Sequence, residues 1–334
     1  MVLKEKIDEL LSHYFKITHY EIQPVPFGLT NITKFLTIDN NKYVVRIYNS
    51  HTKNVQSIKL EAEITTFLNS SNLSFEVPAF LPTLARNQYI HFRDRTLGAV
   101  VSFIEGTIPE MATIQQAENF GSVVGEVSSA LLHFKARDTN YKGMPFSRFN
   151  QLHPLADFNN VDAFFNKPPF HIPSKSMTFY QEMISTLERK IHLIDDLPKQ
   201  FVHHDLLIYN LLATGDRMSG VLDFDFTSLD VSFMEFVISL NHILQLTDGS
   251  WKMVEAYIKG YSQFRKCTSH ELNQLQLLTQ LYHIAVLHIY IGQQYSGVDI
   301  EQNFNYILNQ FITRNDWLNN NGEKINKLIA GYLL

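Results

Sequence analysis

The sequence predicts an α+β protein of two lobes, a strand-rich lobe over residues 1–104 and a mainly helical lobe over residues 105–334. The chain of 334 residues is longer than one typical compact unit and suffices for two lobes with a sizeable core. Short runs with strand-like alternation fill its first third, and long helical patterns take over after Gly106. This change of period places the expected boundary between the lobes.

The first lobe is expected to contain a five-stranded antiparallel sheet and two helices. The helical patterns cover Leu3–Tyr14 and Lys53–Leu68. Strands are expected over residues 20–25, 32–38, 42–48, 88–93 and 97–104. Residues 39–41, Asp-Asn-Asn, tolerate the left-handed conformations of a tight turn, so they predict a hairpin between the second and third strands.

The second lobe is expected to be helical, with one embedded loop and hairpin. Helical patterns cover residues 112–134, 176–193, 234–246, 251–264 and 271–290. Between them, residues 201–226 contain strand-like pieces around a turn at Gly215 and Asp216. The stretch 138–173 is rich in Asn, Pro and Phe, lacks periodicity and predicts surface loops.

The composition is that of an ordinary globular protein, with 45% apolar and 18% charged residues. The net charge of -5 supplies no basic field, so no nucleic-acid partner is expected. Cys267 is the only cysteine, which rules out an intramolecular disulfide and fits a reducing compartment. The amphipathic N-terminus lacks a signal-peptide core, and the apolar stretch 281–291 is too short to span a membrane. We therefore expect a cytoplasmic protein with no membrane partner.

The strongest chemical signal lies between residues 201 and 225. The segment FVHHDLLIYNLL places Asp205 and Asn210 in a loop between apolar runs, and GVLDFD ends a short apolar strand with Asp223. Phosphoryl transfer from ATP needs a carboxylate that accepts the hydroxyl proton and oxygen ligands that hold Mg²⁺. The two loops supply that set. A helix start capped by Asp205, with Asn210 as a turn residue, is the alternative, but a cap does not require this spacing.

The pattern H-x-D-L-x-x-x-N-L-L followed by G-V-L-D-F-D resembles the superfamily of aminoglycoside phosphotransferases, choline kinases and type II homoserine kinases. The resemblance implies a bilobal protein-kinase-like fold. It also implies Asp205 as catalytic base, Asn210 and Asp223 as magnesium ligands, and His203 as a residue that orders the loop. Protein kinases share this logic, but the chain has Asp225 in place of the Gly of D-F-G and no A-P-E signature. Protein kinase activity is therefore the weaker interpretation.

Several positions depart from the family's pattern. His204 stands where the family tends to have Gly, and Leu207 stands where it often has His. The family usually has an Asp that supports the catalytic loop from the next helix; here Glu235 or Asp230 would have to serve, and both could be structural. These departures leave the shape of the loop and the subfamily open.

The resemblance places a phosphate-covering loop at Gly28, Thr30 and Asn31, between two expected strands. Backbone amides and the Thr30 hydroxyl would contact phosphate oxygens there. A bare hairpin turn is the alternative.

The resemblance also implies that the segment VVSFIEG is the linker between the lobes. Ser102, Phe103 and Ile104 would then contact adenine. Without the resemblance, this segment is only a buried strand that ends in a turn.

Arg46 stands on the third strand where the family usually has a phosphate-gripping lysine. Arginine binds phosphate or carboxylate through two N–H groups and keeps its charge. Its expected partner is Glu61, an acid on the apolar stripe of the following helix, with Glu63 as the second choice; the alternative for either is an acid on the surface of the helix. Lys42 lies at the start of the strand and could not easily take its place. A solvent-facing strand arginine is the alternative.

Taken together, these residues predict an ATP- and Mg²⁺-dependent kinase that phosphorylates a hydroxyl of a small molecule. The acceptor would be an amino acid, an amino alcohol or an aminoglycoside- or sugar-like compound. The alternative is a catalytically weak nucleotide-binding regulator of the same fold, suggested by Arg46 and by the glycine-poor phosphate loop. His283 and His288 miss the i, i+4 spacing of a helical metal pair, so they are expected in the core or substrate pocket. The sequence predicts neither the acceptor's identity nor the oligomeric state.

Overall fold

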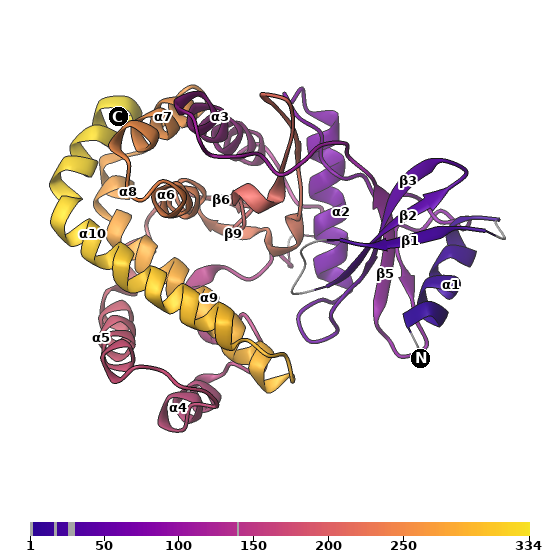
Figure 1. Cartoon of the computed structure of the whole chain (residues 1–334), viewed down its shortest axis with the longest axis horizontal. Helices are drawn as coiled ribbons and strands as arrows, with labels where there is room; N and C mark the ends of the chain where they lie inside the picture. The colour runs from indigo at the N-terminus through magenta and orange to yellow at the C-terminus, as the bar shows by residue number, and fades with distance from the viewer. Residues whose placement is uncertain (1–2, 17–18, 26–30, 139) are drawn as a thin grey trace. The chain divides into compact units, whose positions relative to one another are not determined.

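The computed structural model describes residues 3–16, 19–25, 31–138 and 140–334 (Figure 1). The chain forms two compact units. The first unit comprises residues 1–108, 134–142 and 210–225, and the second comprises residues 109–133, 143–209 and 226–334. Both units are therefore discontinuous in sequence. The lobe boundary expected at residue 104 stays a prediction.

The first unit is built on a five-stranded antiparallel sheet, as predicted, with the strand order β1-β2-β3-β5-β4. Its strands are β1 (Glu21–Pro24), β2 (Ile32–Ile38), β3 (Asn41–Ile47), β4 (Ile90–His91) and β5 (Leu97–Ser102). Its helices are α1 (Leu3–Tyr14) and α2 (Val55–Ser70), and a separate hairpin pairs β7 (Leu211–Thr214) with β8 (Arg217–Val221). The β2–β3 turn uses φ angles of 47° at Asp39 and 63° at Asn40, as the turn chemistry predicts.

Alternation along β3 assigns its side chains to two different cores. Val45 and Ile47 pack in the cluster that contains the apolar side chains of α1. Tyr48 packs in a second cluster with Ile58 of α2. Because successive strand residues point to opposite faces, Arg46 points away from the α1 core, toward the face that α2 covers. This is the reason that Arg46 can meet an acid on α2.

The second unit is mainly helical. Its helices are α3 (Ile114–Leu131), α4 (Phe158–Asn166), α5 (Ser174–Lys190), α6 (Met234–Leu246), α7 (Trp251–Ser262), α8 (Ser269–Asn273), α9 (Leu275–Tyr295) and α10 (Glu301–Leu333). A two-stranded sheet pairs β6 (Lys199–Val202) with β9 (Ser228–Val231). Residues 234–244 of α6 are all buried, and Figure 1 shows this helix among α3, α7, α9 and α10. Within the described residues, no helix is long and apolar enough to cross a membrane.

Two glycines allow α3 and α7 to pack with backbone against backbone. A Cβ on Gly121 of α3 would lie 2.0 Å from the carbonyl oxygen of Tyr257, and a Cβ on Gly260 of α7 would lie 2.0 Å from that of Glu118. Any side chain at either position would therefore force the helices apart. This contact fixes α7, which in turn packs against α6.

Two helices correct the sequence-based expectations. The stretch 138–173, expected to be loops, contains α4, whose N-terminus Asp157 caps by accepting a hydrogen bond from the Asn160 amide (2.9 Å). The 33-residue α10 was not predicted at all. Its buried residues include Phe304, Leu308 and Phe311, whose spacing of four and three is the ordinary signal of an amphipathic helix.

Candidate active site

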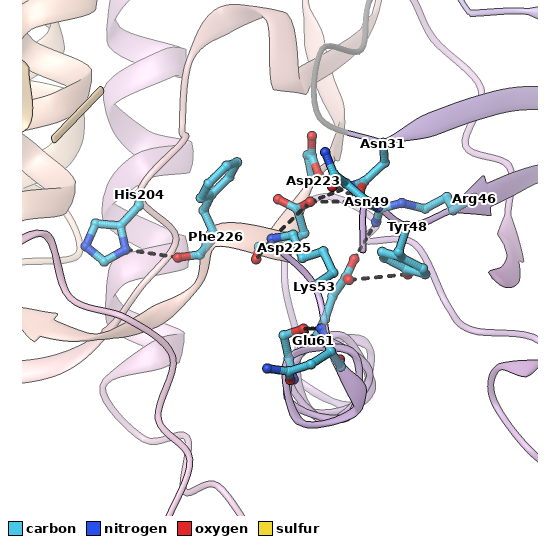
Figure 2. Close-up of polar contacts among 12 residues, drawn as sticks. Asn31, Arg46, Tyr48, Asn49, Lys53, Glu61, His204, Asp223, Asp225 and Phe226 are labelled. Atoms are coloured by element: carbon cyan, nitrogen blue, oxygen red, sulfur yellow. Dashed lines mark hydrogen bonds and ion pairs between the residues drawn. The ribbon is translucent and has the colours of Figure 1, made fainter. Parts of the chain in front are cut away.

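In the first unit, Arg46 joins the sheet to α2 and to the segment after β8 (Figure 2). Its Nη1 pairs with Oε1 of Glu61, and its Nη2 lies 3.0 Å from Oδ1 of Asp223. Arg46 is 7% exposed and Glu61 is 3% exposed, so the pair is shielded from water. The Tyr48 hydroxyl donates a hydrogen bond to the other Glu61 oxygen (3.4 Å). Glu63 instead accepts a hydrogen bond from the Arg137 amide (3.0 Å).

A second buried cation, Lys53, completes this cluster. Its Nζ donates to the backbone carbonyl of Asp225 (2.5 Å) and lies 3.3 Å from Oδ2 of the same residue. Asn31 Nδ2 donates to that same Oδ2 (2.6 Å), while Asn31 Oδ1 accepts from the Asn49 amide (3.1 Å). Asn31 therefore lies in the cluster, whereas Gly28 and Thr30 lie outside the described residues. Lys53 is a functional candidate that the sequence does not reveal, because a lysine before a helix carries no local signal.

The cluster holds three carboxylates against two cations. Burial raises the pKa of Glu61 to about 7, although the charge of Arg46 opposes this shift. Desolvation and the charge of Asp225 raise the pKa of Asp223 to about 6, a shift that water partly screens because 40% of this side chain is exposed. Burial would also raise the pKa of Asp225, but Lys53 and Arg46 outweigh it and lower that pKa. When all three carboxylates are ionised, the cluster carries one surplus negative charge, which a further cation would balance.

The segment after β8, residues 222–225, offers oxygen atoms suited to a hard cation such as Mg²⁺. Oδ1 of Asp225 is buried, and no described atom bonds it. Asp223 adopts a φ of 65°, and the preceding Leu222 donates its amide to the Asn210 carbonyl (2.8 Å), which ties Asn210 to this segment. No group of three or more His, Cys, Asp or Glu residues forms a metal site in the described part of the chain. A few protein oxygens fit Mg²⁺, which takes its other ligands from phosphates and water.

The segment after β5 is packed against β8. The Ser102 hydroxyl accepts a hydrogen bond from the Ala79 amide (2.9 Å). Ile104 is buried and packs so closely on Gly220 that a Cβ at this glycine would lie 2.8 Å from the Ile104 side chain. Phe103 is half-buried, and Lys42 Nζ lies 5.0 Å from its ring centroid. Lys42 pairs with Glu105 (2.8 Å) at the surface, so it does not take part in the Arg46 cluster.

Asp205 lies in the second unit, in the loop that follows β6. Its amide donates to Nδ1 of His203 (3.1 Å), and its carbonyl accepts from the Leu207 amide (2.8 Å). The Ser239 hydroxyl of α6 donates to the Leu206 carbonyl (2.8 Å). These bonds order the backbone around Asp205 and attach the loop to α6.

Two tyrosines of α9 lie within electrostatic range of Asp205. Burial and then the charge of Asp205 raise the pKa of Tyr282 well above its usual value and that of Tyr290 to about 12. Both hydroxyls therefore stay protonated at neutral pH and can donate hydrogen bonds.

His204, at the position where the related pattern has Gly, has a φ of 69°. This left-handed conformation is strained for a residue with a side chain. The ring compensates with contacts: it stacks on Phe146 (centroids 4.3 Å apart), and Nε2 lies 2.9 Å from Oδ2 of Asp230. The other ring nitrogen lies 3.2 Å from the Phe226 carbonyl (Figure 2). Asp230 also accepts from the amides of Phe146 (2.8 Å) and Val231 (2.7 Å).

Glu235 supports the same loop from the first turn of α6. Its Oε2 accepts the His203 amide (2.7 Å), and the side chain is fully buried. Burial raises the pKa of Glu235 to about 7, although the bond from His203 opposes the shift. The structure thus gives both acids a contact with the loop: Asp230 with the His204 ring and Glu235 with the His203 backbone.

His283 and His288 belong to the core of the second unit. Both are completely buried, and burial lowers the pKa of each to about 3, so both are neutral at physiological pH. His283 stacks on Phe311 (4.9 Å), and His288 lies 2.6 Å from the Tyr180 hydroxyl.

A sheet-based unit with a buried Arg–Glu pair and a helical unit, connected by an H-x-D-x₄-N segment that runs from the second unit into the first, are the parts of a protein-kinase-like phosphotransferase. The family model described as "Phosphotransferase enzyme family" matches residues 21–267, and the chain belongs to this family. It is a kinase of the small-molecule class, with a hydroxyl group as acceptor.

Named relatives agree with this class. The homoserine kinase of Parvibaculum lavamentivorans is 25% identical over 83% of this chain and 81% of its own length. That of Methylobacillus flagellatus is 23% identical over 80% and 78%. Among solved structures, a microcompartment-associated aminopropanol kinase matches with a TM-score of 0.71 at 14% identity, covering 97% of this chain and 99% of its own. An amicoumacin kinase solved with AMP-PNP and Ca²⁺ matches with a TM-score of 0.69 at 14% identity, covering 94% of each chain.

Proposed function

We propose that the protein transfers the γ-phosphoryl group of ATP, with Mg²⁺, to the hydroxyl of a small amino acid or amino alcohol. The observation that carries the proposal is the cluster in which Arg46 bonds both Glu61 and Asp223 while Asp225 keeps a buried, unbonded oxygen. The relatives' names support the acceptor class, because homoserine and aminopropanol both carry an amino group and a hydroxyl.

The first unit binds the nucleotide in this proposal. The Arg46 guanidinium, held by Glu61, binds phosphate oxygens through an N–H group. The backbone of residues 102–104 binds adenine, and the loop that contains Gly28, Thr30 and Asn31 covers the phosphates. Asn210 and Asp223 would hold Mg²⁺, with Oδ1 of Asp225 as a further oxygen. The ion would neutralise charge on the transferred phosphoryl group.

Asp205 orients the acceptor hydroxyl and accepts its proton as the bond to phosphorus forms. His203 and Glu235 hold its loop in position through the bonds described above. Tyr282 and Tyr290, which lie in the electrostatic range of Asp205, are the residues proposed to line the acceptor side.

A turnover assay with Mg²⁺-ATP and a panel of hydroxylated amino acids, amino alcohols and sugars tests this proposal. The wild type should phosphorylate at least one acceptor. The variant Asp205→Ala should lose a factor of about a thousand or more in kcat. Asp216→Ala, at an exposed turn of the first unit, is the control and should retain full activity.

Two other outcomes would reject the proposal. Tight binding of Mg²⁺-ATP without phosphorylation of any acceptor would favour a nucleotide-binding regulator. Failure to bind ATP would exclude both the kinase and the regulator.

A further inference from the structure

The second unit contains a buried arginine that forms no ion pair with any residue that the structure describes. Arg314 of α10 is only 2% exposed, and none of the ion pairs among the described residues includes it. Its Nη2 donates a long hydrogen bond to the Asn241 carbonyl (3.3 Å), while its Nε has no partner in the described part of the chain. A buried charge without a counter-ion is unfavourable, so such a residue points to a ligand that supplies the missing charge.

Arg314 lines a pocket of about 130 Å³ between the end of α6 and the middle of α10. Gln245, Tyr306, Gln310 and Trp317 also line this pocket, so its wall offers hydrogen-bonding groups and aromatic surface together. This space admits a small organic molecule.

The lining of the pocket also includes one acidic side chain, Asp248. Asp248 is exposed and lies in the turn after α6, where it has a φ of 48° and Gly249 has a φ of 71°. A side chain on Gly249 would also approach Nε1 of Trp317 to 2.8 Å, so this turn depends on glycine. The pocket lining therefore contains an exposed carboxylate and a buried guanidinium.

From this arrangement we infer that the pocket binds a small zwitterion, an α-amino acid whose carboxylate pairs with Arg314 and whose ammonium group pairs with Asp248. An inorganic anion would satisfy Arg314 but would be repelled by Asp248. An amine without a carboxylate would leave Arg314 unpaired. A compound with both charges can pair with Arg314 and with Asp248, and the polar lining residues can donate or accept hydrogen bonds to its other polar groups.

The pocket is separate from the acceptor side proposed at Asp205, because its lining does not include Asp205, Tyr282 or Tyr290. The inference does not depend on the proposed kinase reaction, because it concerns binding alone.

Calorimetric titration of alanine into the full-length protein without nucleotide tests this inference. Alanine has both charges but no hydroxyl that could be phosphorylated. We expect saturable binding, and about tenfold or greater weakening for propionate and for ethylamine, which each keep one charge. Asp248→Asn should weaken alanine binding about tenfold without weakening propionate. Asp316→Asn, an exposed acid of α10 outside the pocket, should have no effect.

Two further variants locate the bound amino acid. Arg314→Met should abolish alanine binding, with thermal unfolding as the check that it folds, while Asp205→Asn should leave binding unchanged. The inference is wrong if wild type does not bind alanine, if Arg314→Met binds it normally, or if propionate or inorganic phosphate binds as tightly. Loss of binding in Asp205→Asn would place alanine at the acceptor side and overturn the separate site. If Arg314→Met does not fold, alanine binding by Asp248→Asn decides the question, because this substitution is at an exposed position and leaves the core intact. Unchanged alanine binding by that variant would then overturn the inference.

Discussion

Substitutions of His204 separate two opposing contributions to the stability of the catalytic loop. The residue has a φ of 69°, where a side chain costs about 1–2 kcal/mol. The contacts of its ring with Asp230 and Phe146 stabilise the folded state and offset part of this strain. His204→Ala removes the ring contacts and keeps the strain, whereas His204→Gly removes both. Comparing the two variants therefore isolates the strain.

The expected magnitudes follow from these contacts. A hydrogen bond to a charged group contributes about 1.5–3 kcal/mol, and a stacked aromatic pair contributes about 0.5–1.5 kcal/mol. Asp230 keeps its bonds from two backbone amides, so its carboxylate is not left unbonded. His204→Ala should therefore lower the free energy of unfolding by about 2–4 kcal/mol. His204→Gly should be about 1 kcal/mol more stable than His204→Ala.

Urea unfolding of the wild type and both variants at pH 7 and 25 °C measures these differences. At an ordinary position, Gly is about 0.5–1 kcal/mol less stable than Ala, so the sign of the difference is the decisive result. The reasoning is refuted if His204→Ala is as stable as His204→Gly, or more stable. Turnover is a second readout: both variants should lose kcat while KM for ATP changes little, because His204 is adjacent to Asp205, whereas the proposed nucleotide-binding residues belong to the first unit.

Three further substitutions test other parts of the structure. The pKa of Glu235 is raised to about 7, so the folded state binds more protons than the unfolded state between pH 4.5 and 7. The contribution of Glu235 to the free energy of unfolding therefore falls by about 3 kcal/mol as the pH rises through that window. Glu235→Gln should unfold at a higher urea concentration than wild type at pH 8 but not at pH 5, and an unchanged pH dependence would contradict this. In Arg46→Lys, the lysine has a single side-chain nitrogen and cannot contact both Glu61 and Asp223 as the two guanidinium nitrogens do. We expect kcat/KM for ATP to fall by about 10–100-fold, and wild-type kinetics would show that the double contact is unnecessary. Gly121→Ala would clash with a carbonyl of α7, so its melting temperature should fall by several degrees, and an unchanged value would mean that the helices separate easily.

Much of the first unit follows from local sequence. The α1 and β2 boundaries match the predicted ranges, because apolar periodicity and turn residues determine them. The orientation of Arg46 toward α2 also follows from alternation along a strand, and the position of Glu61 follows from the apolar stripe of its helix. These are local rules that a single sequence can express.

Long-range contacts of polar residues could not be predicted in the same way. Lys53 bonds Asp225, which lies 172 residues later, and nothing in the local sequence marks the pair. His204 could be recognised as a departure from Gly, but its compensation by Asp230 and Phe146 depends on tertiary packing. The long helix α10 is a different case, because its pattern was present in the sequence and was overlooked.

Phosphorus NMR of a reaction that contains the protein, Mg²⁺-ATP and homoserine tests the central claim most directly. The account predicts a new phosphomonoester signal that grows in step with ADP and disappears when Mg²⁺ is chelated. Replacement of homoserine by other hydroxylated amino acids or amino alcohols extends the same test to the full acceptor class. Persistence of ATP with every acceptor, or formation of ADP and inorganic phosphate alone, would contradict the account.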